Sequence, residues 1–206
     1  MRKGDAVVKI TNKNIDAGNA FDWGRTSKDY AKYRDIYPSV FYEKIAERGL
    51  CVANQRVLDL GTGTGVLPRN MYTYGANWTG TDISQQQIEE AKALARQMNQ
   101  NISYFCVSAE DISFTSHTFD VITACQCFWY FDYERLLPKL LQYLKPEGRL
   151  LFLYMAWLPQ EDAIAGASEQ LVLKYSPKLV RSPESICTLF SLPDCVNEVF
   201  EPVAHE

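Results

Sequence analysis

The sequence predicts an α/β fold in which a doubly wound, mostly parallel sheet carries helices on both faces. Three observations lead to this prediction. Short apolar, strand-like runs alternate with amphipathic helical runs between residues 50 and 157, a pattern typical of parallel strands joined by crossover helices. A glycine-rich loop directly follows the first strand-like run, and no linker divides the stretch. We therefore expect it to fold as one unit.

Five runs rich in apolar residues are the predicted strands, at 56–60, 77–81, 102–107, 119–124 and 149–156. After the second run, Ser84 and Gln87 have the spacing of a capping box, and an apolar face extends to Met98, which predicts a helix. After the fourth run, the leucines between 136 and 144 predict another helix, which Lys-Pro-Glu-Gly at 145–148 ends.

The chain is expected to consist of two parts. Residues 1–48 are an N-terminal arm followed by cap helices, which meet at Tyr37-Pro38 because the position before a proline disfavours helix. Residues 49–206 form the sheet domain. Beyond the fifth strand the sequence predicts helices at 160–175 and 183–190 and a single strand at 196–203.

Composition narrows the classes of function. Of the 206 residues, 47% are apolar and 22% charged, and the 25 acidic residues outnumber the 21 Lys and Arg. This balance is typical of a soluble globular protein and argues against a nucleic-acid partner. The longest apolar run, 150–158, is too short to cross a membrane, and the N-terminus lacks the apolar core of a secretory signal, so we expect a cytoplasmic protein. The two histidines lie far apart and no Cys-x-x-Cys occurs, so no metal site is expected.

The most informative segment is a strand that runs into three glycines at alternate positions, Gly61, Gly63 and Gly65. Glycine tolerates positive φ, so such a loop turns sharply and presents backbone N–H groups to a ligand. At the end of the second strand, Asp82 offers two oxygens that can accept from the vicinal hydroxyls of a ribose. A glycine loop followed by a distant acid indicates a nucleoside site.

The spacing of the glycines favours one class of nucleoside. Dinucleotide-binding folds use G-x-G-x-x-G with a pyrophosphate at the helix N-terminus. Here the glycines follow G-x-G-x-G, and Asp59 stands two residues before them. A carboxylate beside the loop repels a pyrophosphate and suits a cationic ligand, so an NAD-dependent oxidoreductase is the less favoured interpretation.

The segment 59–65 resembles the first motif of the class I methyltransferases that use S-adenosylmethionine, and Asp82 resembles their ribose-binding acid. The segments 108–111, 119–122 and 144–150 resemble further motifs of the same family. The resemblance covers about residues 28–157 and implies a Rossmann-like fold. The segment 29–38 also resembles the opening of the small-molecule branch that includes quinone-biosynthesis and trans-aconitate methyltransferases.

The resemblance implies roles for individual residues. Gly61 and Gly63 pack against the methionine part of the cofactor, Asp59 orients the loop or binds the amino group, and Asp82 binds the ribose. Glu110 or Asp111, of which we favour Asp111, accepts from the adenine amino group. The full set of cofactor residues is Asp59, Gly61, Thr62, Gly63, Asp82, Ile83, Ala109, Glu110, Asp111 and Cys125. The alternatives are a structural turn for the glycines, helix capping for Asp82 and a solvated turn for the acids after the third strand.

Methyl transfer from a sulfonium is an in-line displacement with an activated leaving group, so alignment of donor and acceptor can suffice. No catalytic base is assigned, and Trp129 stands where relatives often carry histidine. The candidates for the acceptor pocket are Tyr30, Tyr33, Arg34, Gln126, Trp129 and Tyr130. Core packing is the alternative for the aromatic residues.

These inferences lead to an S-adenosylmethionine-dependent methyltransferase that acts on a small-molecule acceptor and releases S-adenosylhomocysteine. The alternatives are a non-catalytic S-adenosylmethionine or nucleoside-binding module and the oxidoreductase. The family's sheet has seven strands, and few residues follow Trp157, so we predict that the seventh strand is missing and that the chain is truncated at its C-terminus. The open sheet edge then needs cover, which a homodimer would supply.

Overall fold

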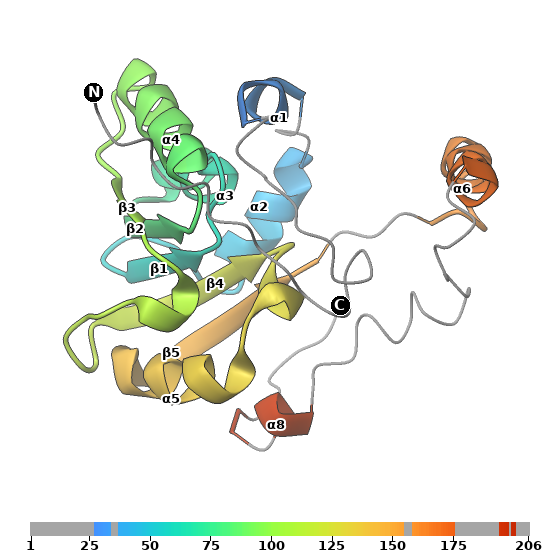
Figure 1. Ribbon diagram of the computed structural model, residues 1–206. Coiled ribbons are helices and arrows are strands. Elements are labelled where there is room, and N and C mark those ends of the chain that lie inside the picture. The colour runs from blue at the N-terminus through green and yellow to red at the C-terminus, as the bar shows by residue number, and fades with distance from the viewer. Residues whose placement is uncertain (1–26, 34–36, 155–157, 176–193, 198, 201–206) are drawn as a thin grey trace, which may run out of the picture. The chain divides into compact units, whose positions relative to one another are not determined.

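The computed structural model describes residues 27–33, 37–154, 158–175, 194–197 and 199–200. The chain divides into two compact units, Met1–Leu153 and Tyr154–Glu206. The first unit contains the sheet and the predicted nucleoside site (Figure 1). In the described part of the chain, no helix combines the length and the apolar character needed to cross a bilayer.

The first unit is built on a five-stranded parallel sheet in the order β3-β2-β1-β4-β5. Its strands are β1 (Arg56–Leu60), β2 (Asn77–Asp82), β3 (Ser103–Cys106), β4 (Phe119–Cys125) and β5 (Leu144–Leu153). The doubly wound α/β prediction is therefore confirmed. The direction of winding reverses between β1 and β4, where the loops at the carboxyl ends of the two strands diverge and leave room for a ligand.

The predicted start of β5 needs correction. The strand begins at Leu144 rather than at 149, because the backbone that leaves the preceding helix is already extended and Leu144 pairs with Phe119. The residues 145–148 therefore end the helix, as expected, and also belong to the strand. The ladder shifts register between Phe119 and Val121. Residues 155–156 of the predicted strand lie outside the described residues.

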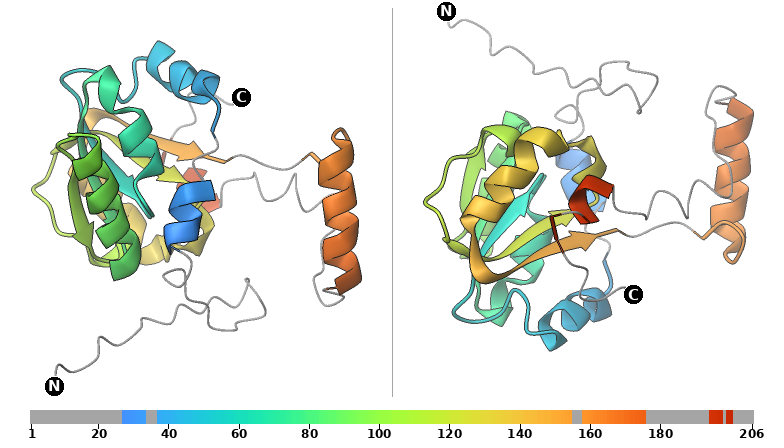
Figure 2. Two further views of the ribbon diagram at one scale, coloured as in Figure 1. Left: turned by 90° about the horizontal axis from the view of Figure 1, so that it is seen from above. Right: turned by 90° about the horizontal axis from the view of Figure 1, so that it is seen from below.

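Helices cover both faces of the sheet. The helices α2 (Ser39–Glu47), α3 (Val66–Asn70) and α4 (Gln85–Gln97) lie on one face, and α5 (Tyr133–Tyr143) lies on the other (Figure 2). On the first face, apolar side chains of α2 and α3 pack against Val57 and Val121. Strand side chains alternate between faces, so their neighbours Leu58 and Ile122, both fully buried, point to the second.

Helix boundaries follow the local signals. Ser84 is the N-cap of α4, and its hydroxyl accepts from the Gln87 backbone N–H at 3.4 Å. Pro38 is the N-cap of α2, which confirms the helix start expected at this proline, and α1 (Ser27–Tyr33) ends before it. Residues 34–36 lie outside the described residues, so the meeting of the two helices at Pro38 stays a prediction.

The second unit is described only in part. Its helix α6 (Ala163–Tyr175) confirms the helix predicted at 160–175, while the helix predicted at 183–190 lies outside the described residues. The strand predicted at 196–203 is wrong at its start, since α8 (Asp194–Asn197) is helical and the N–H groups of Val199 and Phe200 both bond to the Val196 carbonyl. Asp194 in the first turn favours a helix there, because its charge complements the helix dipole.

Candidate active site

The glycine loop leaves β1 at the carboxyl end of the sheet. Gly61, Gly63 and Gly65 have φ values of 58°, 57° and 75°, a left-handed conformation that suits glycine. A Cβ atom at Gly61 would lie 2.8 Å from the Cys127 Sγ, and one at Gly65 would overlap the hydroxyl of Tyr104. A Cβ atom at Gly63 would meet nothing closer than 3.9 Å. The loop is thus packed from behind at Gly61 and Gly65, whereas the space beside the Gly63 Cα is open to a ligand. The N–H groups of Thr62, Gly63 and Gly65 donate to Thr81, Asp82 and Thr62, so the expectation that the loop presents these N–H groups to a ligand is wrong.

Asp82 ties the loop to the end of β2. Its Oδ2 accepts from the backbone N–H of Gly63 at 2.9 Å, and its Oδ1 accepts from the N–H of Ser84 at 2.8 Å. The N-cap of α4 is Ser84 and not Asp82, so helix capping does not account for this carboxylate. Burial raises the pKa of Asp82, against the two backbone hydrogen bonds that lower it.

Asp59 is buried in the middle of the sheet. Paired positions place it in one row with Tyr104, Gly80 and Thr123 of the neighbouring strands. The Thr123 hydroxyl donates to Asp59 Oδ1 at 2.6 Å. Burial raises the pKa of Asp59 to about 6, although the hydrogen bond from Thr123 lowers it. A carboxylate in so apolar a place is stabilised by a nearby positive charge.

These acceptors can be compared with the two classes of nucleoside ligand, a cationic nucleoside and a dinucleotide with a pyrophosphate. Asp59 and Asp82 flank the loop with acceptors, and the open backbone lies at Gly63 between them. A ligand with cationic groups and vicinal hydroxyls, such as S-adenosylmethionine, fits these partners. A pyrophosphate would face two carboxylates and does not fit.

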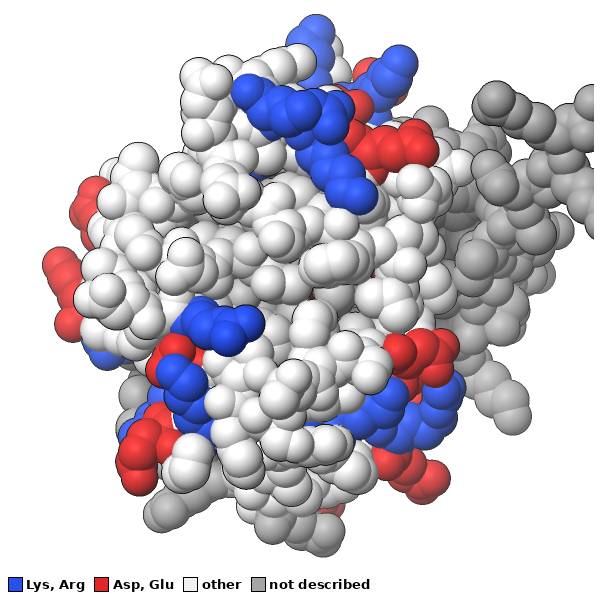
Figure 3. Space-filling model, turned by 90° about the vertical axis from the view of Figure 1, so that its left-hand side faces the viewer, with Lys and Arg blue, Asp and Glu red and all other residues white. Residues whose placement is uncertain are grey.

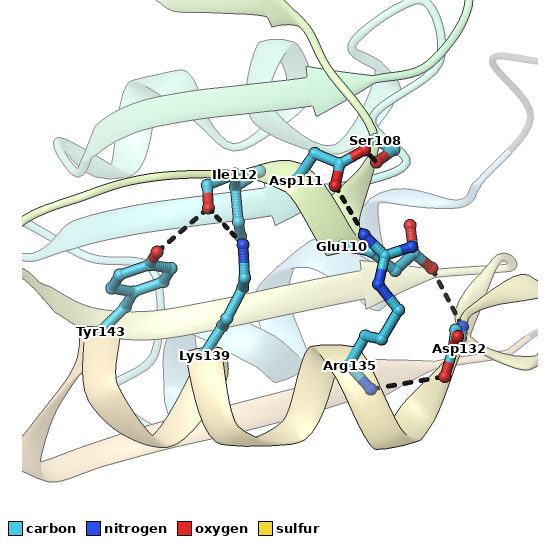
Figure 4. A network of polar contacts seen from close by, with 8 residues as sticks. All are labelled: Ser108, Glu110, Asp111, Ile112, Asp132, Arg135, Lys139 and Tyr143. Atoms are coloured by element: carbon cyan, nitrogen blue, oxygen red, sulfur yellow. Dashed lines mark hydrogen bonds and ion pairs between the residues drawn. The ribbon is translucent and has the colours of Figure 1, made fainter.

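The predicted adenine residues lie in the short helical turn η4 (Ala109–Asp111). Ala109 is buried, while Glu110 and Asp111 take part in a surface network with α5 (Figure 4). Asp111 accepts from the Ser108 hydroxyl at 2.8 Å and from the Arg135 guanidinium at 2.7 Å, and both contacts lower its pKa. Glu110 accepts from the Asp132 backbone N–H at 3.0 Å. Ile83, the remaining candidate near the adenine, is half-buried.

The end of β4 reaches the same edge of the sheet. Cys125 is half-buried, and its thiol donates to the hydroxyl of Tyr37 at 3.6 Å. Gln126 has a left-handed φ of 61°, which for a residue with a side chain marks a backbone held by its surroundings. Burial raises the pKa of the Cys127 thiol, which donates to the Leu60 carbonyl at 3.1 Å.

The aromatic residues after β4 divide into two groups. Phe128 is 3% exposed and packs against Phe131, Tyr133 and Phe152. Trp129 and Tyr130 are only half-buried. Core packing therefore explains Phe128 and leaves Trp129 and Tyr130 with surface available to a ligand.

The acceptor candidates of the cap are only partly described. Tyr33 is 65% exposed, and the Lys32 ammonium lies 4.9 Å from the centre of its ring. Its helix α1 contacts α4. The side chain of Tyr30 and the whole of Arg34 lie outside the described residues.

Three residues of the site were missed by the sequence analysis: Tyr37, Thr123 and Cys127. Each contacts a partner that is remote in the sequence, at Cys125, Asp59 and Leu60 respectively. The one sequence signal is that Thr123 is a polar residue inside an apolar predicted strand, and its pairing with Asp59 becomes apparent only from the observed register.

A cavity of about 290 Å³ lies at the other end of the sheet, where Arg48, Asp120, Lys145 and Arg149 contribute to its lining. Asp120 is the second residue of β4 and pairs with Lys145 at 2.7 Å. On the face turned toward the viewer in Figure 3, Lys and Arg alternate with Asp and Glu around a broad uncharged area. Because Asp120 lies at the start of β4, this cavity is remote from the glycine loop, which follows the end of β1. The lining of the cavity carries charges of both signs.

Comparison with known proteins identifies similar sequences. Residues 57–148 match a family model described as a methyltransferase domain. A ubiquinone biosynthesis O-methyltransferase of Coxiella burnetii is 33% identical over 110 residues, which are 53% of this chain and 47% of that protein. One of Neisseria meningitidis is 28% identical over 176 residues, covering 80% of this chain and 73% of that protein. The chain spans about half the length of the first of these relatives.

Solved structures share the fold. The crystal structure of a putative S-adenosyl-L-methionine-dependent methyltransferase from Methanococcus maripaludis superposes with a TM-score of 0.64 at 16% identity, covering 85% of this chain and 82% of that one. The [4+2]-cyclase SpnF superposes with a TM-score of 0.50 at 28% identity, covering 54% of this chain and 43% of that one.

Proposed function

We propose, from the methyltransferase domain matched at residues 57–148 and the relatives described above, that this chain is a class I S-adenosylmethionine-dependent methyltransferase and that it transfers the methyl group of S-adenosylmethionine to a small-molecule acceptor. The observation that carries the proposal is the link between Gly63 and Asp82, with the buried Asp59 beside them. It combines an open backbone, a ribose-type acceptor and a negative charge at one edge of the sheet.

The residues that would hold the cofactor follow from this arrangement. Asp82 accepts from the ribose hydroxyls, and Asp59 attracts the positive charge of the methionine part beside Gly61 and Gly63. The other proposed contacts are Thr62, Ile83, Ala109, Glu110, Asp111 and Cys125. The cofactor, when bound, supplies a methyl group on a sulfonium, whose departure needs no activation by an acid. The chain's own residues then have to orient the two reactants and exclude water.

The acceptor is proposed to lie against the half-exposed rings of Trp129 and Tyr130, close to Gln126. Two flat side chains that are partly exposed suit an aromatic or otherwise planar small molecule. Tyr30, Tyr33 and Arg34 of the cap are proposed to close this pocket. The ubiquinone biosynthesis O-methyltransferases found by comparison support an oxygen atom as the methylated group.

Ligand-induced stabilisation tests the cofactor. A ligand at about 100 times its dissociation constant adds about 2.7 kcal/mol to the free energy of unfolding. We expect S-adenosylhomocysteine and S-adenosylmethionine to raise the Tm and NAD to leave it unchanged. Asp82→Asn should abolish most of the shift, whereas Glu47→Gln, an exposed acid of α2, should retain it. A shift with NAD alone would refute the proposal.

A second candidate is a protein that binds S-adenosylmethionine or another nucleoside without transferring a methyl group. The similarity to a [4+2]-cyclase favours it, since a protein of another activity shares this fold at 28% identity. Release of S-adenosylhomocysteine in the presence of a panel of phenols and carboxylic acids separates the two. Tight cofactor binding without any methyl transfer would favour the second candidate.

The assembly and location are part of the same proposal. In the described residues, β5 pairs with β4 on one side and with no further strand on the other. We propose that a homodimer covers this edge in the cytoplasm, with the cap of residues 1–48 over the sheet domain and without a nucleic-acid partner. Sedimentation analysis of the full chain should show a dimer, and a monomer would exclude this assembly.

A further inference from the structure

The segment 127–132 is held at both of its ends by segments proposed to contact the cofactor. At its start, the Cys127 thiol donates to the carbonyl of Leu60, directly before the glycine loop. At its end, the Asp132 backbone N–H donates to Glu110 in η4. Between the two anchors stand Trp129 and Tyr130, proposed above for the acceptor. We call residues 127–132 the aromatic segment.

The second anchor completes the cap of α5 from outside the helix. Asp132 is the N-cap, and its carboxylate accepts from the Arg135 backbone N–H at 3.3 Å. In a capping box, an acidic or amide residue three positions later accepts in return from the N-cap N–H. That position holds Arg135, which cannot accept, and Glu110 takes over the role at 3.0 Å.

The arginine in turn reaches the other acid of η4. Its guanidinium lies 2.7 Å from Asp111 Oδ1, while Asp111 Oδ2 accepts from Ser108. Figure 4 shows both contacts. Two contacts therefore join η4 to the start of α5. Glu110 of η4 accepts from the Asp132 backbone N–H, and Arg135 of α5 donates to Asp111 of η4. A shift of η4 on cofactor binding would be transmitted to the N-terminus of α5 and to the aromatic segment.

We propose that Arg135 is a positioning residue that couples cofactor binding at η4 to the order of the aromatic segment. This inference rests on the proposed function, since it requires a nucleoside at η4. Both groups of the ion pair are more than half exposed, and exposed pairs contribute little to the free energy of folding. The Arg135 side chain holds Asp111 and acts on the aromatic segment through η4, whose Glu110 accepts from the Asp132 N–H.

Hydrogen exchange of the full chain, with and without S-adenosylhomocysteine, tests the coupling. In the wild type, we expect the ligand to slow exchange of the amides in 127–132. In Arg135→Leu, the ligand should still bind, with a dissociation constant raised by no more than about fivefold, and its effect on these amides should fall by at least half. Arg135→Lys, which keeps the charge, should restore part of the effect. Arg96→Leu, an exposed arginine at the end of α4, is the matched control.

The outcomes separate this inference from the function on which it rests. If the wild type does not bind S-adenosylhomocysteine, the proposed function fails and the coupling with it. If the wild type binds and exchange in 127–132 is unchanged, the coupling alone is refuted. Equal ligand-induced protection in Arg135→Leu and wild type would refute the role of Arg135, and the Tm of each variant shows that the compared proteins are folded.

Discussion

The hydroxyl of Thr123 in β4 donates to the carboxylate of Asp59 in β1 across 2.6 Å, inside the sheet and away from water. The two residues are 64 positions apart in sequence and face each other because their strands pair in parallel. Thr123 also lies 3.4 Å from the Leu58 carbonyl. Because a hydroxyl has one proton, the shorter contact identifies Asp59 as its main acceptor.

Thr123→Val is expected to change the pH dependence of cofactor binding. With a pKa of about 6, Asp59 loses its charge as the pH falls through 6, and the affinity for a cationic cofactor should fall with it. Loss of the hydroxyl removes a hydrogen bond that favours the charged form, so the midpoint should move upward by about 0.5 to 1 pH unit. Calorimetric titration with S-adenosylmethionine from pH 5 to 8 measures this, and Thr123→Ser should restore the original midpoint.

Asp59→Asn is expected to stabilise the free protein while weakening cofactor binding. Because burial raises the pKa of Asp59 from 3.8 to about 6, the native state binds the proton more tightly than the unfolded state. Stability from this group is greatest below pH 4 and is lost as the pH rises to about 6. Asparagine avoids that loss, which is roughly 1–3 kcal/mol at pH 7.5. Urea denaturation should show the gain at pH 7.5 and a smaller one at pH 5.

Gly65→Ala should destabilise the protein much more than Gly49→Ala. Both glycines have positive φ, 75° and 69°, so both substitutions carry the backbone cost of about 1 kcal/mol. A Cβ atom at Gly49 has no neighbour within 4 Å, whereas one at Gly65 overlaps the Tyr104 hydroxyl. We expect a further loss of about 1–3 kcal/mol at Gly65. Tyr104→Phe should recover part of it, and equal losses at the two glycines would contradict the packing described for the loop.

Phe128→Ala should mainly lower the stability of the protein, whereas Trp129→Ala should mainly lower its methyl-transfer activity. Phe128 is buried among three other rings, so its loss should cost about 3–5 kcal/mol of unfolding free energy. Trp129 is half-buried and proposed to contact the acceptor. Its substitution should lower methyl transfer while changing the Tm by only a few degrees. A large loss of stability at Trp129 would instead indicate a packing role.

Local signals were sufficient for most of the fold. The alternation of strand and helix patterns predicts the parallel sheet, and Ser84 predicts the start of α4. The start of β5 at Leu144 was missed because it depends on pairing with Phe119 and not on nearby residues. The strand predicted at 196–203 is wrong at its start, because a few apolar residues cannot by themselves distinguish a strand from the turn of α8.

In the candidate site, too, residues marked by local sequence signals were predicted, and residues whose contacts are remote in sequence were missed. Gly63 and Asp82 were identified from spacing, and the structure joins them by a hydrogen bond. The contacts that fix the site from behind, such as Thr123 with Asp59 and Cys127 with Leu60, connect residues more than 60 positions apart. Such pairs follow from strand order and register, which no motif encodes. The cofactor and acceptor roles of the individual residues remain predictions.

The buried carboxylate of Asp59 lowers the stability of the unliganded protein at neutral pH. Under the proposed function, a bound sulfonium compound offsets this loss of stability. The fraction of molecules that open transiently then depends on the concentration of the compound in the cell. Proteases act on the opened form. Degradation of this protein by proteases should then slow as the concentration of the bound compound rises.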